Sequence, residues 1–156
     1  MKRFLFLLCF STELLVSSQQ LYDPTVVYNG PGEFYDVNNI YTLELEFYDP
    51  NYHATLVAWK ESFNESALPA KFDYGGIHYD SVAVKYKGNS TFFVPNVFNN
   101  PKEPYNIDLN DIVSGQNIQG YKKIKLGNAW FDPTFSKEAL SSRIHKQYLP
   151  AYEVSL

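Results

Sequence analysis

The stretch Gly120-Tyr-Lys-Lys-Ile-Lys-Leu-Gly-Asn128, running on into Asp132-Pro-Thr-Phe-Ser-Lys-Glu-Ala-Leu140, predicts a β-strand, a short loop and an α-helix. Lys123 and Lys125 occupy alternate positions of the strand, so we expect both side chains on one face of a sheet. Glu138 falls in the first turns of the helix. A lysine-bearing strand that leads into a helix with a glutamate fits a phosphate-binding lobe, and it fits ordinary surface chemistry equally well.

Further strands are predicted upstream, where apolar and polar residues alternate or aromatic and branched residues gather. Gly75-Gly76 is expected to form the turn of a β-hairpin. The residues from Asn89 to Glu103, which include Pro95, are expected to form a loop. The predicted strands, with the one described above, cover Ile40–Phe47, Ala67–Asp73, Ile77–Tyr86, Tyr105–Leu109 and Tyr121–Leu126.

Two helices complete the predicted fold. The first starts at Asp49-Pro50 and runs to about Phe63, with apolar residues at helical spacing. The second runs from about Pro133 to Gln147, and Asp132 is expected to cap its free amide groups. Strands interrupted by two helices, with a hairpin in the middle, indicate an α+β domain around an antiparallel sheet.

Residues 1–18 have the layout of a secretory signal peptide, which predicts a secreted or cell-surface protein. Lys2 and Arg3 precede the apolar run Phe4–Phe10, and small residues lie before the expected cleavage near Ser18. An acidic residue interrupts the apolar segment, so a poorly ordered N-terminal extension remains the alternative. The run is too short to span a bilayer, and no transmembrane segment is expected.

The composition excludes several functions. The formal charge of −4 argues against non-specific binding to nucleic acid, which needs a strongly basic surface. The only cysteine, Cys9, lies in the expected leader, so the mature chain has no disulfide, thiolate metal site or cysteine nucleophile. Residues 19–39 are rich in turn-forming residues and read as an irregular linker ahead of one domain, which covers residues 40–156.

The three histidines carry no recognisable chemistry in the sequence. His53, His78 and His145 lack paired spacing and nearby carboxylate clusters, so we expect ordinary surface or core residues. Asp108, Asn110 and Asp111 could touch a divalent cation, but a capped turn is the simpler interpretation. No metal site is therefore predicted.

Four motifs in register resemble one known family. They are Tyr86-Lys-Gly-Asn-Ser90, Lys102-Glu-Pro-Tyr-Asn-Ile-Asp-Leu109, and the two stretches quoted at the outset. Their order and spacing are similar to those of the CotH kinase family, the spore-coat protein H-like atypical kinases, over roughly Ile40 to Leu156. The resemblance implies the N-terminal lobe of a kinase-like fold. It also implies transfer of the ATP γ-phosphate, with Mg²⁺, to serine or threonine of a coat or extracytoplasmic protein.

The resemblance also assigns site residues. The turn after the third predicted strand would place backbone amides and a lysine near phosphate, and a lysine paired with the helix glutamate would hold the α- and β-phosphates. Which lysine pairs with the glutamate is left open by the spacing. Lys137 stands where the family has arginine, and Glu103 adds a negative charge. The implied nucleotide-binding residues are Lys87, Gly88, Asn89, Lys102, Lys125 and Glu138.

The chain stops as Tyr152–Leu156 begins to resemble another strand, and it looks truncated. The family's catalytic aspartates are expected beyond Leu156, so this chain alone is expected to be inactive. The alternative function is an exported glycan- or protein-binding or structural module without nucleotide. It rests on the aromatic share of 17%, although aromatic residues in strands more commonly form half-buried sheet faces.

Overall fold

The computed structural model of the chain describes residues 34–36 and 39–145. These residues form a five-stranded antiparallel sheet in the order β1-β2-β3-β4-β5, together with three helices. The predicted α+β class is confirmed, while the predicted leader and the strand expected from Tyr152 lie outside the described residues. The elements are β1 (Leu43–Phe47), α1 (Tyr52–Glu61), β2 (Leu68–Tyr74), β3 (Ile77–Tyr86), α2 (Ser90–Val97), β4 (Tyr105–Asp108), β5 (Lys123–Leu126) and α3 (Lys137–His145).

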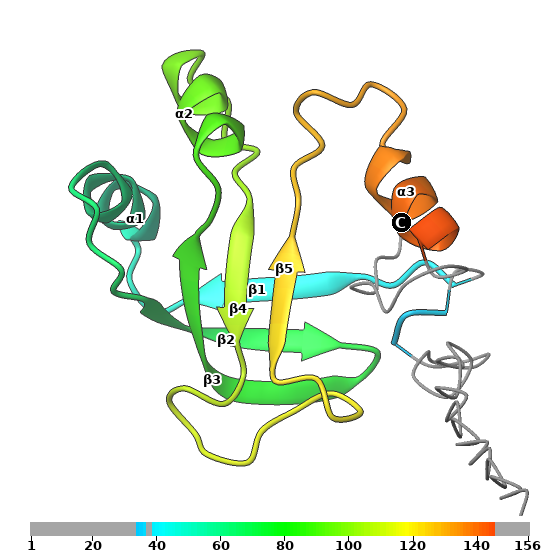
Figure 1. Cartoon of the computed structure of the whole chain (residues 1–156). Coiled ribbons are helices and arrows are strands. Elements are labelled where there is room, and N and C mark those ends of the chain that lie inside the picture. Colours follow the sequence, from blue (N-terminus) through cyan, green and yellow to red (C-terminus); the bar gives the residue numbers. More distant parts are fainter. Residues whose placement is uncertain (1–33, 37–38, 146–156) are drawn as a thin grey trace, which may run out of the picture.

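The sheet curls around its own core. Figure 1 shows β1 and β2 crossing behind β4 and β5, so that the inner faces of the two halves oppose each other. A register shift in β2 between Ala70 and Phe72 helps the sheet to bend. The inner face buries one residue in every two along the strands, and Phe34, from the stretch predicted to be a linker, packs there as well. The buried cluster is Phe34, Ala70, Phe72, Tyr74, Val82, Val84, Ile107, Leu109, Ile118 and Ile124.

The helices α1 and α2 cover one end of the inner face. Leu56 of α1 and Phe92 of α2 are fully buried against Tyr86, the last residue of β3. The predicted first helix exists but ends before Phe63. Phe63 has a left-handed φ of 56° and is 82% exposed, so its helical spacing was misleading. The side-chain carboxylate of Asp49 accepts hydrogen bonds from Asn51 and Thr55 at the start of the helix.

The hairpin between β2 and β3 is confirmed. Gly75 and Gly76 have φ values of 54° and 82°, and the two-residue turn with positive φ at both positions is the type that suits the twist of a hairpin. Strand β3 covers the predicted range, while the other strands differ from their predicted ranges by one to three residues at their ends. Such shifts are normal, because strand ends depend on pairing rather than on local sequence.

The loop predicted from Asn89 to Glu103 is wrong over residues 90–97, where helix α2 forms, and holds for residues 98–103. Pro95 lies inside this helix and has no N–H to donate to the carbonyl of Thr91, four residues earlier. The side chain of Asn128, far away in the sequence, donates to that carbonyl instead, with its Nδ2 at 2.8 Å. A tertiary contact thus replaces the hydrogen bond that the proline removes.

The third helix begins later than predicted. It starts at Lys137, and residues 132–136 form turns ahead of it. Asp132 does cap this region, because its carboxylate accepts hydrogen bonds from the backbone N–H groups of Thr134 and Lys137. Pro133 is therefore a turn residue and not the first residue of the helix.

Candidate functional site

The predicted site segments meet at one end of the sheet. Tyr86, Tyr105 and Leu126 are paired in register across β3, β4 and β5, so the residues just beyond these positions lie side by side. The backbone N–H of Lys87 donates to the carbonyl of Pro104 at 3.0 Å and extends the pairing past the end of β3. Segments 87–89, 102–104 and 127–128 thus become neighbours although they are spread over about forty residues of sequence.

The conformation of the turn at Gly88 is explained by contacts within the chain. Gly88 has φ = 76°, and a Cβ atom there would lie 2.1 Å from Oγ1 of Thr91, so a side chain would clash. Asn89 precedes α2 and makes no side-chain cap, but its carbonyl accepts hydrogen bonds from the N–H groups of Phe92 and Phe93. Lys87 leaves this turn with a half-buried side chain.

Asn128 holds the site segments together. It is 4% exposed, and its Nδ2 donates both to the carbonyl of Thr91 at 2.8 Å and to the carbonyl of Lys102 at 2.9 Å. Its Oδ1 accepts from the backbone N–H of Trp130 at 3.3 Å. One amide side chain therefore links α2, the segment before β4 and the loop after β5. The resemblance included this asparagine, but no role was predicted for it.

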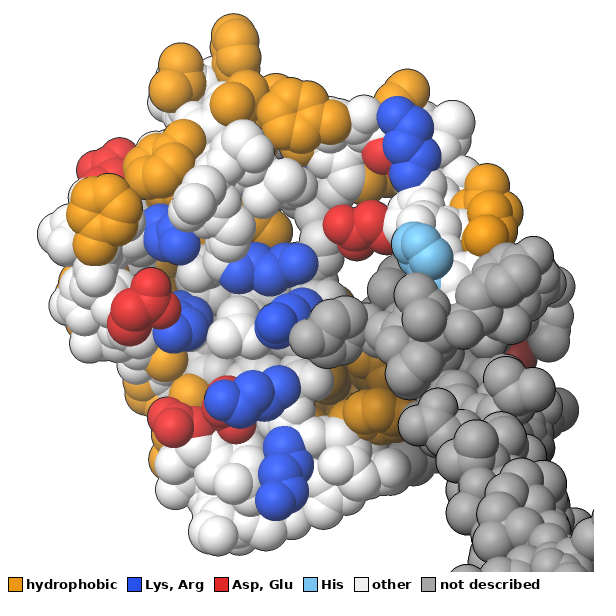
Figure 2. Space-filling model, viewed as in Figure 1, with side chains coloured by type: hydrophobic (Ala, Val, Ile, Leu, Met, Phe, Trp, Pro, Cys, Tyr) orange, Lys and Arg blue, Asp and Glu red, His pale blue; other side chains and the backbone are white. Residues whose placement is uncertain are grey.

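Lys125 and Glu138 fall on the same side of the sheet. The outer face of β3, β4 and β5 presents Lys85, Asn106 and Lys125 in one cross-strand row, and Ile124 points inward between two exposed lysines. Figure 2 shows basic side chains gathered over this face. Gly127 continues the alternation of Lys125, and a Cβ on Gly127 would lie 3.0 Å from Oε2 of Glu138. The carboxylate of Glu138 therefore lies over the end of β5.

Most charges on this outer face are already paired. Lys123 is 2.8 Å from Asp108, and Lys85 is 2.5 Å from Glu65. Neither pair would be worth much in stability, since surface ion pairs typically contribute less than about 1 kcal/mol. Among the described residues, Glu138 makes no ion pair with a lysine. Lys125 and Glu138 thus lie on one face of the sheet without an ion pair between them.

Lys102 lies in a separate environment. Its Nζ is 4.2 Å from the centroid of the Phe135 ring, which is a cation–π contact. The two residues line a cleft of about 350 Å³ together with Asn100, Asn128, Trp130 and Phe131. Among the candidate lysines, Lys125 shares a sheet face with the Glu138 carboxylate, whereas Lys102 lies against the ring of Phe135.

Glu103 is a buried carboxyl group that sequence reasoning missed. It is 4% exposed, and both carboxylate oxygens are buried with no hydrogen-bond partner among the described residues. Burial raises the pKa of Glu103 to about 7. Nearby, burial also raises the pKa of the Tyr86 hydroxyl, which is hydrogen-bonded to Nδ1 of His53. A Lys-Glu-Pro sequence looks like an exposed polar segment, so no local signal revealed the burial.

His78 is an exposed surface residue, as expected, but it has two carboxylate neighbours that were not predicted from the sequence. Its Nδ1 lies 2.7 Å from Asp73 across the hairpin, and its Nε2 lies 3.0 Å from Asp80. Hydrogen bonds to Asp73 and then to Asp80 raise the pKa of His78. The pairing of Asp73 with His78 follows from the hairpin register, which strand spacing alone could have indicated. The turn expected around Asp108 is confirmed, because its Oδ1 accepts from the N–H of Asn110.

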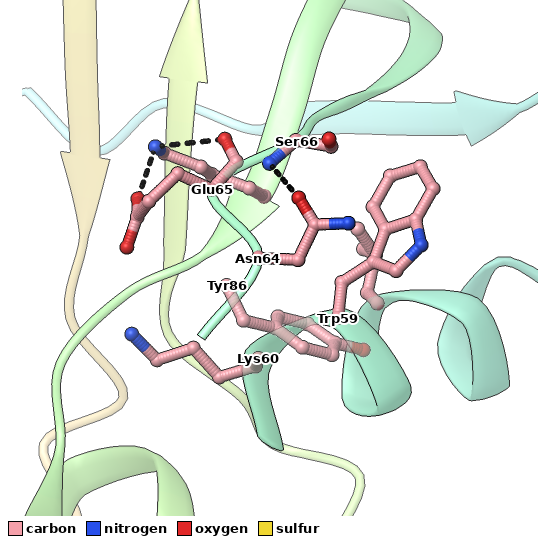
Figure 3. Close-up of a pocket in the computed structure, with 8 residues that line it drawn as sticks. Trp59, Lys60, Asn64, Glu65, Ser66 and Tyr86 are labelled. Atoms are coloured by element: carbon pink, nitrogen blue, oxygen red, sulfur yellow. Dashed lines mark hydrogen bonds and ion pairs between the residues drawn. The ribbon is translucent and has the colours of Figure 1, made fainter. Parts of the chain in front are cut away.

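A second hollow is too small to bind a ligand. It lies between α1 and β3, where Figure 3 shows Trp59, Lys60 and Tyr86 facing the loop that carries Asn64, Glu65 and Ser66. Its volume of about 10 Å³ is room for a single water molecule at most. The ion pair between Lys85 and Glu65 closes one side of it.

The described part of the chain contains no cluster of three or more His, Cys, Asp or Glu residues arranged to hold a metal ion. None of its helices has the length and apolar character needed to cross a bilayer. No protein-family model, curated protein or solved structure matches the chain.

Proposed function

We propose that this chain is the phosphate-binding, N-terminal part of an exported atypical protein kinase similar to the CotH family. One observation carries the proposal: residues 87–89, 102–104, 125–128 and 138 meet at one end of the sheet, with Lys125 and Glu138 on the same face. The motifs that suggested the family are therefore also neighbours in space. The antiparallel pairing of β3, β4 and β5 brings them together.

Lys125 is the residue that would contact phosphate directly. It projects from a strand paired along its length with β4, so the start of its side chain is held rigidly. Glu138, in the first turn of α3, would orient that ammonium group through an ion pair formed when the site closes on the nucleotide. Gly127 matters because a side chain there would displace the Glu138 carboxylate.

The remaining groups would hold the phosphates in position and would take no part in the chemical step. The Gly88 turn and the Lys87 side chain lie beside the same end of the sheet and add positive charge for the distal phosphates. Mg²⁺, when bound with ATP, would neutralise charge on the phosphates. Transfer to a serine or threonine of a coat or cell-surface protein also requires groups that activate the acceptor, and none of the residues named above is assigned that role.

The test is calorimetric titration of ATP–Mg²⁺ into the protein encoded by the longest open reading frame that contains this segment. We expect saturable binding that Lys125→Ala and Glu138→Ala each weaken by about tenfold or more, equivalent to ~1.4 kcal/mol. Lys122→Ala, an exposed lysine on the approach to the same strand, is the matched control and should bind like the parent. Absence of binding to a folded protein would contradict the proposal.

The exposed aromatic residues favour a second function, an exported glycan- or protein-binding module without nucleotide. Figure 2 shows hydrophobic side chains exposed over α2 and around the loop from β5 to α3, and Phe98, Phe131 and Phe135 are all more than half exposed. Under this alternative, substitution of Lys125 leaves partner binding intact, whereas removal of exposed aromatic side chains abolishes it.

A further inference from the structure

The cleft beside α3 has the size and lining of a binding site. Its volume is about 350 Å³, and it is formed by the segment before β4 and the loop from β5 to α3. Ligand pockets in proteins commonly start at about 300 Å³ and combine apolar walls with a few polar groups. Neither Lys125 nor Glu138 is among the residues that line this cleft.

The walls of the cleft are aromatic and accessible. Phe131 is 58% exposed and Phe135 is 59% exposed, which is unusual for two phenylalanines in one short loop. Trp130 is half-buried and stacks on Phe98 of the segment after α2, with ring centroids 6.3 Å apart and an interplanar angle of 22°. The apolar surface thus continues from the cleft toward α2, as in surfaces that bind protein partners.

Two lysines and one aspartate set the charge at the cleft: Lys102 and Asp132 line it, and Lys137 lies beside the lining residue Phe131. The ammonium group of Lys102 lies over the Phe135 ring, and that of Lys137 donates to the carbonyl of Phe131 at 3.4 Å. The one carboxylate in the lining belongs to Asp132, which is buried and accepts hydrogen bonds from Thr134 and from the Lys137 amide. Its negative charge offsets one of the two lysines, so an incoming ligand meets a cleft with one net positive charge.

The floor of the cleft is held in place by the fold. Asn128 ties the loop after β5 to both Thr91 and Lys102, and the Asp132 carboxylate ties the same loop to the start of α3. A preorganised wall lowers the entropy that binding must overcome, so a short ligand can be recognised.

We propose that this cleft binds an acidic peptide segment of a partner protein, with an aromatic side chain of the segment against Phe131 and Phe135 and its carboxylates at Lys102 and Lys137. The charge complementarity selects an acidic partner, and the aromatic walls select a ring. The proposal does not depend on nucleotide binding. It assigns Lys102 to partner recognition instead of to the phosphates.

The first experiment uses the full chain and three tetrapeptides in calorimetric titrations at low salt. The probe is acetyl-Asp-Phe-Asp-Phe-amide, and the controls replace either both aspartates with asparagine or both phenylalanines with alanine. We expect weak saturable binding of the probe, a loss of about fivefold for the uncharged control and no detectable binding without rings. Equal binding of all three peptides, or binding of none, would overturn the proposal.

Two variants then locate the site. Lys102→Gln removes one charge and keeps most of the side chain, and we expect it to weaken the probe by about fivefold; Lys122→Gln, an exposed lysine outside the cleft, should have no effect. Phe135→Ala should weaken the probe by about tenfold or more. Both altered positions are exposed, and circular dichroism checks that the variants are folded.

Tryptophan fluorescence gives a second readout. The sequence has two tryptophans, Trp59 on α1 and Trp130 in the cleft, so Trp59→Phe leaves only the reporter in the cleft. A saturable change in its emission with the probe supports the site. An unchanged emission while calorimetry shows binding would place the peptide elsewhere and refute the assignment. If Lys102→Gln loses ATP binding but keeps peptide binding, Lys102 contacts phosphate and its assignment to the peptide site is wrong.

Discussion

Replacing Asn128 with alanine removes the amide that joins α2, the segment before β4 and the loop after β5. In the folded protein its Nδ2 donates to the carbonyls of Thr91 and Lys102 at 2.8 and 2.9 Å, and the side chain is 4% exposed. The carbonyl of Thr91 has no helical donor, because Pro95 stands at the position that would supply it. The substitution therefore leaves that carbonyl without its protein partner.

The magnitude follows from these contacts. Each buried hydrogen bond contributes about 1 kcal/mol net, and an acceptor left unsatisfied in the interior costs about 1–3 kcal/mol. The second carbonyl belongs to Lys102, which is an exposed residue, so we assign its loss the low end of that range. We expect Asn128→Ala to lower the free energy of unfolding by about 2–3 kcal/mol in total.

Urea unfolding followed by circular dichroism measures this change, provided that the slope with denaturant stays the same. The control is Asn96→Ala, where the amide makes one exposed side-chain contact with Glu61 at 3.2 Å. It should stay within about 0.5 kcal/mol of the parent. A loss below about 1 kcal/mol for Asn128→Ala would refute the role assigned to this side chain.

A double-mutant cycle tests the same reasoning more directly. Pro95→Ala restores an N–H that can donate to the Thr91 carbonyl, so it should make Asn128→Ala less harmful. We expect the double variant to be more stable than the sum of the single changes predicts by about 0.5–1.5 kcal/mol. Strict additivity would show that the asparagine does not substitute for the missing helical hydrogen bond.

Three further substitutions test other parts of the fold. Glu103, whose pKa is raised from 4.5 to about 7, binds more protons folded than unfolded in that range, so its burial lowers stability as the pH rises from 4.5 to 7. Between pH 4.5 and pH 8, the free energy of unfolding should fall by up to about 3 kcal/mol less in Glu103→Gln than in the parent, as measured by urea unfolding. An identical pH dependence in the parent and the variant would contradict this expectation. The raised pKa of His78 means that its pairing with Asp73 and Asp80 stabilises the fold fully below pH 6.5 and is lost as the pH rises through the folded-state pKa. The stability difference between the parent and His78→Gln should therefore shrink on raising the pH from 5 to 9, and a constant difference would argue against the pairing. Gly88→Ala should lower thermal stability by about 1–3 kcal/mol, because alanine meets Thr91 at a left-handed φ; calorimetry that finds no loss would show that the turn can relax.

The convergence of the site depended on information that local sequence does not carry. The sequence correctly placed Lys123 and Lys125 on one face, since side chains in a strand alternate regardless of what surrounds them. It could not tell which lysine shares a sheet face with Glu138, because that depends on where the loop after β5 turns. The burial of Glu103 was equally invisible, because it results from segments packed around a sequence that looks polar.

Patterns with a short physical range were determined by the sequence alone. The two glycines at 75–76 permit the positive φ that a tight hairpin turn requires, and the alternation of β3 indicates one buried face, so the hairpin and the α+β class could be predicted directly. Helix α2 was decided only by the tertiary structure. Its proline argues for a loop until Asn128, 33 residues later in the chain, supplies a hydrogen bond to Thr91. Local propensity determines which conformations have a low free energy in isolation. A distant donor can still make a locally unfavourable helix stable, because a buried carbonyl needs a hydrogen-bond partner and that partner can come from anywhere in the chain.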